Sequence, residues 1–142
     1  MTAPNENLYS LFESRFPADR SRPFLEIPGG KTWSYADLKA ESGRIANRLR
    51  ALGVTPGERV AVQVEKSPEA LFLYLACLRA GAIYLPLNTA YKAGEIGYFL
   101  GDSEPRVFVC DPAAEAEARD LAEKSGVAHV ETLGADGTGS LT

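Results

Sequence analysis

Polar side chains that could hold a ligand follow three apolar segments of this sequence. They are Glu65 and Lys66, then Asn88 with Tyr91, and finally Asp111. If the three segments are parallel strands, these residues lie at the carboxyl edge of a sheet, where open α/β sheets bind ligands. By position alone, the Asp111 carboxylate could bind Mg²⁺, and Glu65 with Lys66 could hold a polar ligand.

Each of these candidates also has a structural explanation, which the sequence favours. Asp111 stands directly before Pro112, an arrangement typical of a helix N-cap. Glu65 and Lys66 lead into the helix start Ser67-Pro68-Glu69 and are expected to be solvated.

The remaining polar candidates are equally compatible with structural roles. Asn88 suits a turn, and Tyr91 suits a position half-buried against a helix. No strand end is followed by the glycine fingerprint of a dinucleotide site or by a Gly-x4-Gly-Lys-Ser/Thr loop. The segment "GADGTGS" lacks a lysine and is interpreted as a flexible linker.

Sulfur and imidazole chemistry is poorly supported. Cys77 and Cys110 are too far apart for a CxxC site, and both are expected to be buried core thiols. His129 is the only histidine, with no cysteine near it in sequence. A metal centre or a Ser-His-Asp triad built within this chain is therefore not expected.

The elements that position these residues alternate between helix and strand. A short helix at 8–16 and a hairpin around residues 28–30 come first. Apolar periodicity and caps then predict helices at 35–52, 68–80, 93–103 and 113–125, and strands at 59–64, 82–85, 106–110 and 128–133. This order is typical of an α/β fold: a Rossmann-like layered domain with a mainly parallel sheet and flanking helices.

The helix at 68–80 is apolar nearly all round. It must be covered on more than one side, either by the sheet and other helices or by chain outside these residues. Gly81 is expected to end it, and Pro86 to end the following strand. If the cover lies outside, a separate 142-residue chain should expose this helix and aggregate.

Length and composition indicate one globular domain. The 142 residues are 45% apolar and 24% charged, and a net charge of −4 gives no basic surface for nucleic acid. The longest apolar run, 70–78, is too short to span a membrane, and the N-terminus lacks the features of a signal peptide. A cytoplasmic location is expected.

Several linked motifs, in order, resemble the N-terminal part of the adenylate-forming acyl-CoA synthetases. The resemblance covers 8–111, most of the chain. The motifs are "TWSYADL", "GERVAV", "SPE", "LRAGA", "PLN" with Tyr91 and Glu95, and "DSEP". Within this superfamily, "VEKSPEALFLYLACLRAGAIYLPLNTAY" with "VETLGADGTGSLT" is most similar to the bacterial malonyl-CoA synthetases.

The resemblance implies an ATP-dependent acid–CoA ligase. Such enzymes use ATP and Mg²⁺ to convert a carboxylate into an acyl-adenylate, and CoA then displaces AMP. The family's phosphate loop, adenine-binding motif, ribose-binding aspartate and catalytic lysine have no counterpart here. The arginine that the family is expected to use for the second carboxylate of malonate also has no counterpart here. Arg79 is explained by its place at the end of a helix, and Arg106 by its place at the start of a strand. No catalytic, cofactor-binding or metal-binding residue is therefore assigned.

The resemblance also predicts how the chain is organised. Residues 1–133 are expected to be the N-terminal part of the large synthetase domain, and 134–142 a glycine-rich linker to further chain. The expected partners of the chain are the rest of the enzyme, a malonate-like acid, ATP and CoA. The chain alone is expected to have no activity. Two alternatives remain open: a stand-alone Rossmann-like binding or interaction domain, and a synthetase for another small acid.

Overall fold

The structure, a computed structural model, describes residues 4–142. Its helices are α1 (Leu8–Ser14), α2 (Tyr35–Ala51), α3 (Pro68–Ala80), α4 (Ala93–Ser103) and α5 (Glu115–Ser125), with a 3-10 turn η1 (Pro112–Ala114). Its strands are β1 (Pro23–Glu26), β2 (Thr32–Ser34), β3 (Arg59–Gln63), β4 (Ile83–Pro86), β5 (Val107–Cys110) and β6 (His129–Thr132). Residues 1–3 of the unit predicted at 1–133 lie outside the described residues.

Four strands form one parallel sheet in the order β4-β3-β5-β6. Val60 of β3 lies opposite Tyr84 on one side and opposite Val107 on the other. β1 and β2 form the antiparallel hairpin expected around residues 28–30. The predicted α/β fold with a mainly parallel sheet is confirmed.

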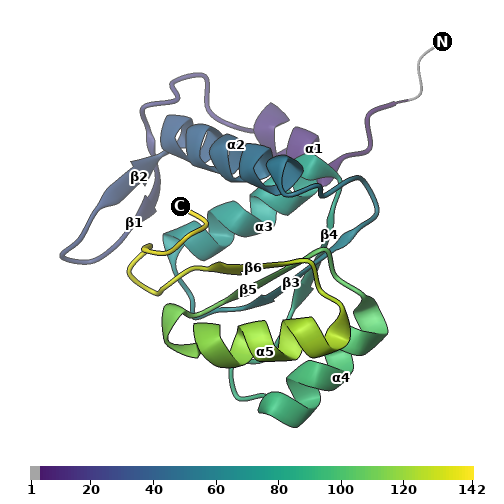
Figure 1. Cartoon of the computed structure of the whole chain (residues 1–142). Coiled ribbons are helices and arrows are strands. Elements are labelled where there is room, and N and C mark those ends of the chain that lie inside the picture. The colour runs from purple at the N-terminus through teal and green to yellow at the C-terminus, as the bar shows by residue number, and fades with distance from the viewer. Residues whose placement is uncertain (1–3) are drawn as a thin grey trace.

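Helices cover both faces of this sheet. Figure 1 shows α2 and α3 on one side and α4 and α5 on the other. Because successive side chains of a strand point to opposite faces, β3 contributes to two cores. Val60 and Val62 join the core under α2 and α3, whereas Ala61 joins the core formed with α4 and α5.

Helices α2 and α3 begin at serine caps, and α3 ends at a glycine. Ser34 Oγ accepts a hydrogen bond from the Asp37 amide (3.1 Å), and the Ser34 amide donates to Asp37 Oδ2 (2.8 Å), which completes a capping box at the start of α2. Ser67 Oγ accepts from the Ala70 amide at the start of α3. Gly81 ends α3 in the left-handed conformation, with φ of 71°.

Helix α3 is covered by the described residues themselves. All 13 of its residues are buried or partly buried. The sheet packs on one side and α2 on another, so the expectation of cover on more than one side is confirmed. The structure contradicts the premise that this helix would be left bare in a separate chain.

The glycine-rich tail folds back on β6 instead of extending as a flexible linker. We call residues 133–142 the C-terminal return. The Leu141 amide donates to the Thr132 carbonyl (3.2 Å), Ser140 Oγ accepts from the Thr132 amide (2.9 Å), and the Leu141 side chain is buried. The hydroxyl of Ser140 also donates to the buried Glu131 carboxylate, which forms an ion pair with Arg48. Composition alone predicted flexibility because it does not reveal these contacts.

Candidate functional site

The carboxyl edge of the sheet contains a topological switch point. The chain passes from β3 to β4 on one side, then crosses to β5 on the other side of β3. Open α/β sheets bind ligands in the crevice that forms where the strand order reverses. Gln63 and Cys110, the last residues of β3 and β5, are register partners at this point.

A cavity of about 350 Å³ lies at this switch point. Phe108 and Cys110 of β5 contribute buried parts of its lining, and Tyr91 comes from the loop before α4. Lys92 and Glu117 are exposed and supply charges of opposite sign. The volume of this cavity is in the range of small-ligand sites, and its charged lining residues, Lys92 and Glu117, are exposed to solvent.

Gln63 organises this edge, and sequence reasoning missed it. Its Nε2 atom donates to the carbonyls of Asn88 (3.0 Å) and Tyr91 (3.2 Å), which holds the loop after β4 against β3. The available signal was a polar residue directly after the apolar residues 60–62 of the strand. Its partners are backbone atoms about 25 residues away, so no local motif reveals them.

Asn88 and Tyr91 have the structural roles that the sequence favoured. Asn88 Oδ1 accepts a hydrogen bond from the Ala90 amide (2.9 Å), a side chain closing its own turn. The Tyr91 ring stacks on Phe99 of α4 with centroids 5.2 Å apart.

Asp111 caps a helix turn, as its position before Pro112 predicted. Its Oδ1 atom accepts from the Ala113 amide at 2.8 Å. In residues 4–142 the structure contains no group of three or more His, Cys, Asp or Glu side chains able to hold a metal ion. The reading of Asp111 as a Mg²⁺ ligand gains no support from its surroundings.

Glu65 and Lys66 are not brought together with the other candidates. Both are exposed in the connection to α3. Lys66 lines a different, open cavity beside the hairpin, whose walls include Trp33 and Asp136. Trp33 is covered by the Lys31 ammonium, 3.6 Å from its ring centroid, in a cation–π contact.

Both cysteines are buried, as expected. Burial raises the pKa of the Cys77 thiol to about 12 and that of Cys110 to about 11. Both therefore remain protonated at neutral pH, and the thiol form is a weak nucleophile. The cavity that Cys110 lines offers no thiolate for covalent catalysis.

The remaining candidates lie away from the switch point. His129 begins β6 and is paired in register with Val107, at the amino end of the sheet. Arg79 donates to the Lys39 carbonyl (2.7 Å) and to Ser42 Oγ, so its guanidinium links α3 to α2. Arg106 immediately precedes β5, also at the amino end. No described helix is long and apolar enough to cross a membrane.

Comparisons with known proteins give the family. The model of the AMP-binding enzyme family matches residues 12–140. Malpinin synthetase of Mortierella alpina is 39% identical over 125 residues, which is 87% of this chain and 2% of that protein. Feruloyl-CoA synthase of an Amycolatopsis species is 40% identical over 84 residues, 59% of this chain and 17% of that protein.

Solved structures of related proteins support the same family. The apo structure of MatB from Rhodopseudomonas palustris superposes with a TM-score of 0.89 at 49% identity, covering 95% of this chain and 26% of MatB. The ATP-bound structure of MatB matches equally well. The chain thus spans about a quarter of its solved relatives and a smaller part of the curated ones. As the sequence resemblance predicted, the chain belongs to the AMP-binding enzyme family of adenylate-forming synthetases.

Proposed function

We propose that this chain is the N-terminal scaffold of a cytoplasmic ATP-dependent acid–CoA ligase that activates malonate or methylmalonate. The single observation that carries the proposal is the likeness to MatB, at 49% identity and a TM-score of 0.89 over 95% of the chain. In the assembled enzyme the products would be malonyl-CoA, AMP and pyrophosphate. Residues 1–133 form the first part of the large domain, and residues 134–142 lead toward the rest.

In this proposal ATP, Mg²⁺ and CoA serve the assembled enzyme and do not bind tightly to the chain alone. ATP supplies the leaving group that makes the acid reactive toward a thiol. Such chemistry depends on cations and donors held against developing charge. The described residues offer no metal cluster, and their thiols are protonated at neutral pH. Their contribution is to hold the sheet and its loops in place.

A synthetase for another acid is the second candidate. It is favoured by the 40% identity to feruloyl-CoA synthase over 84 residues. Malonate carries a second carboxylate, which needs a cation in its pocket, whereas ferulate does not. Arg79 is committed to Lys39 and Ser42 by hydrogen bonds, so it is no candidate for that cation. In this proposal, the residues that distinguish malonate from another acid as the substrate lie outside this chain.

The test compares a full-length synthetase carrying these residues with the purified 142-residue chain. We expect thioester formation from malonate, ATP and CoA by the former, with acetate, ferulate and amino acids as competing substrates. The chain alone should show no malonate-dependent exchange of pyrophosphate into ATP. It should bind ATP no more tightly than about 1 mM, near −4 kcal/mol. A preference for another acid would overturn the malonate assignment and leave the family unchanged.

Substitutions test the scaffold role directly. In the full-length enzyme, Glu65→Gln, Lys66→Met and Asp111→Asn should each change kcat less than about threefold, because removal of one catalytic donor costs about 10²–10³-fold. Lys66→Met and Glu65→Gln remove charge from exposed positions, and Asp111→Asn keeps an oxygen for the cap. A hundredfold loss in any of them, or robust exchange by the chain alone, would mean that these residues belong to the active site.

A further inference from the structure

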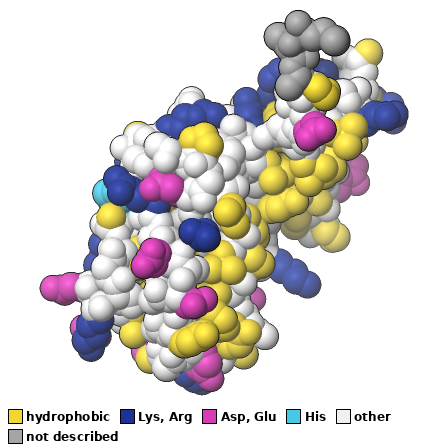
Figure 2. Space-filling model, turned by 90° about the vertical axis from the view of Figure 1, so that its right-hand side faces the viewer, with side chains coloured by type: hydrophobic (Ala, Val, Ile, Leu, Met, Phe, Trp, Pro, Cys, Tyr) yellow, Lys and Arg dark blue, Asp and Glu magenta, His cyan; other side chains and the backbone are white. Residues whose placement is uncertain are grey.

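An open cavity of about 650 Å³ lies beside Trp33, between the hairpin, the first turn of α3 and the C-terminal return. Lys31, Lys66 and Glu69 bring charges of both signs to its walls, and the rest of the lining is largely apolar. Figure 2 views the molecule from the side away from the hairpin, where hydrophobic side chains form a band instead. The cavity beside Trp33 therefore combines charged and apolar groups around one space.

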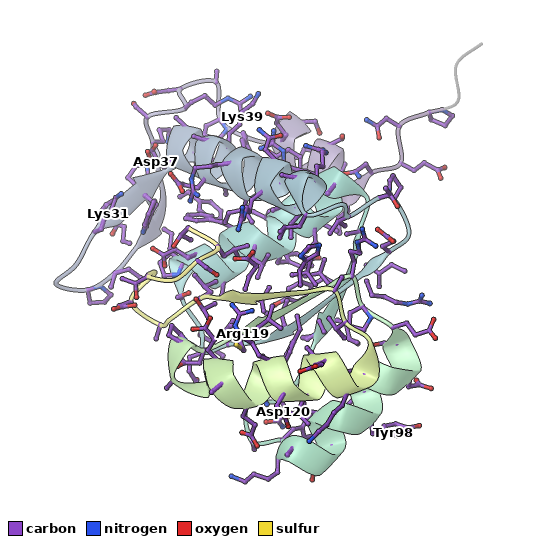
Figure 3. All side chains as sticks on the ribbon, viewed as in Figure 1. Lys31, Asp37, Lys39, Tyr98, Arg119 and Asp120 are labelled. Atoms are coloured by element: carbon purple, nitrogen blue, oxygen red, sulfur yellow. The ribbon has the colours of Figure 1, made fainter. Side chains whose placement is uncertain are left out.

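The C-terminal return forms one wall of this cavity. Ala135 and Asp136 line it directly. Gly137 passes so close to α3 that a Cβ there would lie 2.5 Å from Glu69 Oε1. Figure 1 shows the return beside the start of α3, and Figure 3 shows Lys31 on the hairpin at the same side of the molecule. The position of the return thus determines how wide the cavity opens.

The turn at 134–138 is held together by its own hydrogen bonds. The Gly134 amide donates to the Thr138 carbonyl (2.7 Å), and the Gly137 amide donates to the Gly134 carbonyl (3.0 Å). Asp136 Oδ1 accepts from the amide (3.0 Å) and the hydroxyl (2.6 Å) of Thr138. Because these bonds use only atoms of the turn, the turn can move as one piece.

Hydrogen bonds join the return to β6 over a short span. The Ser140 amide donates to Thr132 Oγ1, and the Thr132 amide donates to Ser140 Oγ, each at 2.9 Å. The Leu141 amide donates to the Thr132 carbonyl at 3.2 Å. A Cβ at Gly139 would lie 2.2 Å from the same carbonyl oxygen, so glycine is what allows the close approach.

Glu131 adds the one charged group to this attachment. Its side chain is buried, it accepts a hydrogen bond from the Ser140 hydroxyl, and it forms an ion pair with Arg48 at 2.8 Å. Hydrogen bonds to a carboxylate are stronger than those between neutral groups. A buried carboxylate that loses a donor must regain water, so its bond to Ser140 favours the closed position of the return.

We propose that the C-terminal return is a gate for the cavity beside Trp33, locked by Glu131. In the closed state Ser140 bonds to Glu131 and the return completes the cavity wall. In the open state this bond is broken, Glu131 keeps its ion pair with Arg48, and the return swings outward while the sheet stays folded. The gate is a property of the described residues and does not depend on which acid the synthetase activates.

Gly134 is the pivot of this movement. Leu133, directly before it, is fully buried and donates its amide to the Cys110 carbonyl (2.9 Å), which anchors the chain to β5. Glycine has the widest choice of φ and ψ, so the direction of the chain can change there at little cost. Opening withdraws the buried Leu141 side chain, which keeps the closed state the more populated one.

Hydrogen exchange tests the gate in the 142-residue chain and in a full-length synthetase that carries it. In both, the Ser140 and Leu141 amides should exchange faster than the amides of β3 and β5, because local opening requires less free energy than unfolding of the sheet. Ser140→Ala should speed exchange at Leu141 by about tenfold or more, the effect of losing a hydrogen bond to a charged group. Equal acceleration throughout β3 and β5, or none at Leu141, would overturn the proposal.

Further variants separate the lock from a general loss of stability. Glu131→Gln, which keeps the size of the side chain and removes its charge, should speed exchange at Leu141 as Ser140→Ala does. Ser140→Thr, which keeps the hydroxyl at an exposed position, should restore slow exchange. The matched control is Glu115→Gln, which removes an exposed partner of Arg119 on α5 and should change exchange at none of these amides. Fast exchange in Ser140→Thr would contradict the role of the hydroxyl.

Trp33 reports directly on the cavity, because it is the only tryptophan of the 142-residue chain and lines the cavity wall. Quenching of its fluorescence by acrylamide should increase in Ser140→Ala and Glu131→Gln, with an unchanged circular dichroism spectrum, and should not change in Glu115→Gln. Faster exchange at Leu141 with unchanged quenching of Trp33 would show that the return loosens without opening the cavity. That result would also overturn the gate.

Discussion

Asp37 shows how one side chain determines where a helix begins. The Ser34 amide donates to its carboxylate, and this hydrogen bond holds the pKa of Asp37 below its ordinary value. A carboxyl group with a lowered folded-state pKa stabilises the protein above its unfolded-state pKa, about 3.9. That stability is lost as the pH falls through the folded-state value.

We therefore predict that Asp37→Ala lowers the free energy of unfolding by about 1 kcal/mol at pH 7, the usual loss at an N-terminal cap. The difference from the unsubstituted chain should shrink at pH 3 and below, because Asp37 is then becoming protonated. Urea denaturation at pH 7 and at pH 3 measures this difference in the free energy of unfolding. Asp120→Ala, which removes an exposed pair with Lys124, serves as the control and should change stability little at either pH. A difference that stays constant with pH would contradict the argument.

Sequence reasoning at the residue scale succeeded where the partner is local. The caps at Asp37 and Asp111 and the turn at Asn88 use atoms two or three residues away, so the spacing alone predicts them. Gln63 and Glu131 were missed because their partners are brought close only by the folded sheet. The candidate site was predictable as a place, the carboxyl edge, but not as a set of contacts.

Among the elements, α4 ends in an unusual way. Its C-cap is Glu104, with φ of 49°, the only described residue other than glycine with positive φ. Helices α3 and α5 end at Gly81 and Gly126, which adopt the same left-handed region at little steric cost. The Glu104 backbone is therefore strained by comparison.

Glu104→Gly should raise the free energy of unfolding by about 0.5–1 kcal/mol, because relief of left-handed strain exceeds the extra entropy of glycine in the unfolded chain. Thermal and urea unfolding measure the change. Asp102→Gly, two residues earlier inside α4, is the matched control and should lower stability by about 0.5–1 kcal/mol. A loss of stability in both variants would show that the Glu104 side chain makes a contribution larger than the strain.

The elements themselves were largely predictable, because each has its own apolar period and its own stop signal. Two differences arose, one at the start of a helix and one at the C-terminal end of the described chain. The helix expected at 113–125 begins as the 3-10 turn η1 before α5, since Asp111 caps that first turn. The C-terminal return was expected to be flexible from its composition. Its order comes from contacts that composition does not reveal, namely the Arg48–Glu131 ion pair and the burial of Leu141.

The whole molecule has two cores that share one sheet. Phe72 of α3 belongs to the core under α2, and Phe108 of β5 belongs to the core over α4 and α5. Both rings are almost fully buried. Since β3 and β5 supply side chains to both cores, we expect the two cores to unfold together.

Phe72→Leu and Phe108→Leu should each lower the free energy of unfolding by about 1–2 kcal/mol, because a smaller side chain leaves a cavity in the core, and should leave one cooperative transition. Trp33 fluorescence reports the first core, because its ring lies 5.0 Å from that of Phe72. Far-ultraviolet circular dichroism reports all helices. Transitions that separate in the Phe108→Leu variant would show that the two cores unfold independently.

The strand order has a consequence for a chain emerging from the ribosome. β3 is the first strand of the parallel sheet to be made, and it lies inside the sheet; β4 then joins one side, β5 the other, and β6 the far side of β5. Every new strand is added at an existing edge, and none is inserted between two strands already paired. Domains fold from the N-terminus during synthesis, so this sheet can grow outward in the order in which it is translated. The growing sheet therefore needs no rearrangement to reach the final order of its described strands.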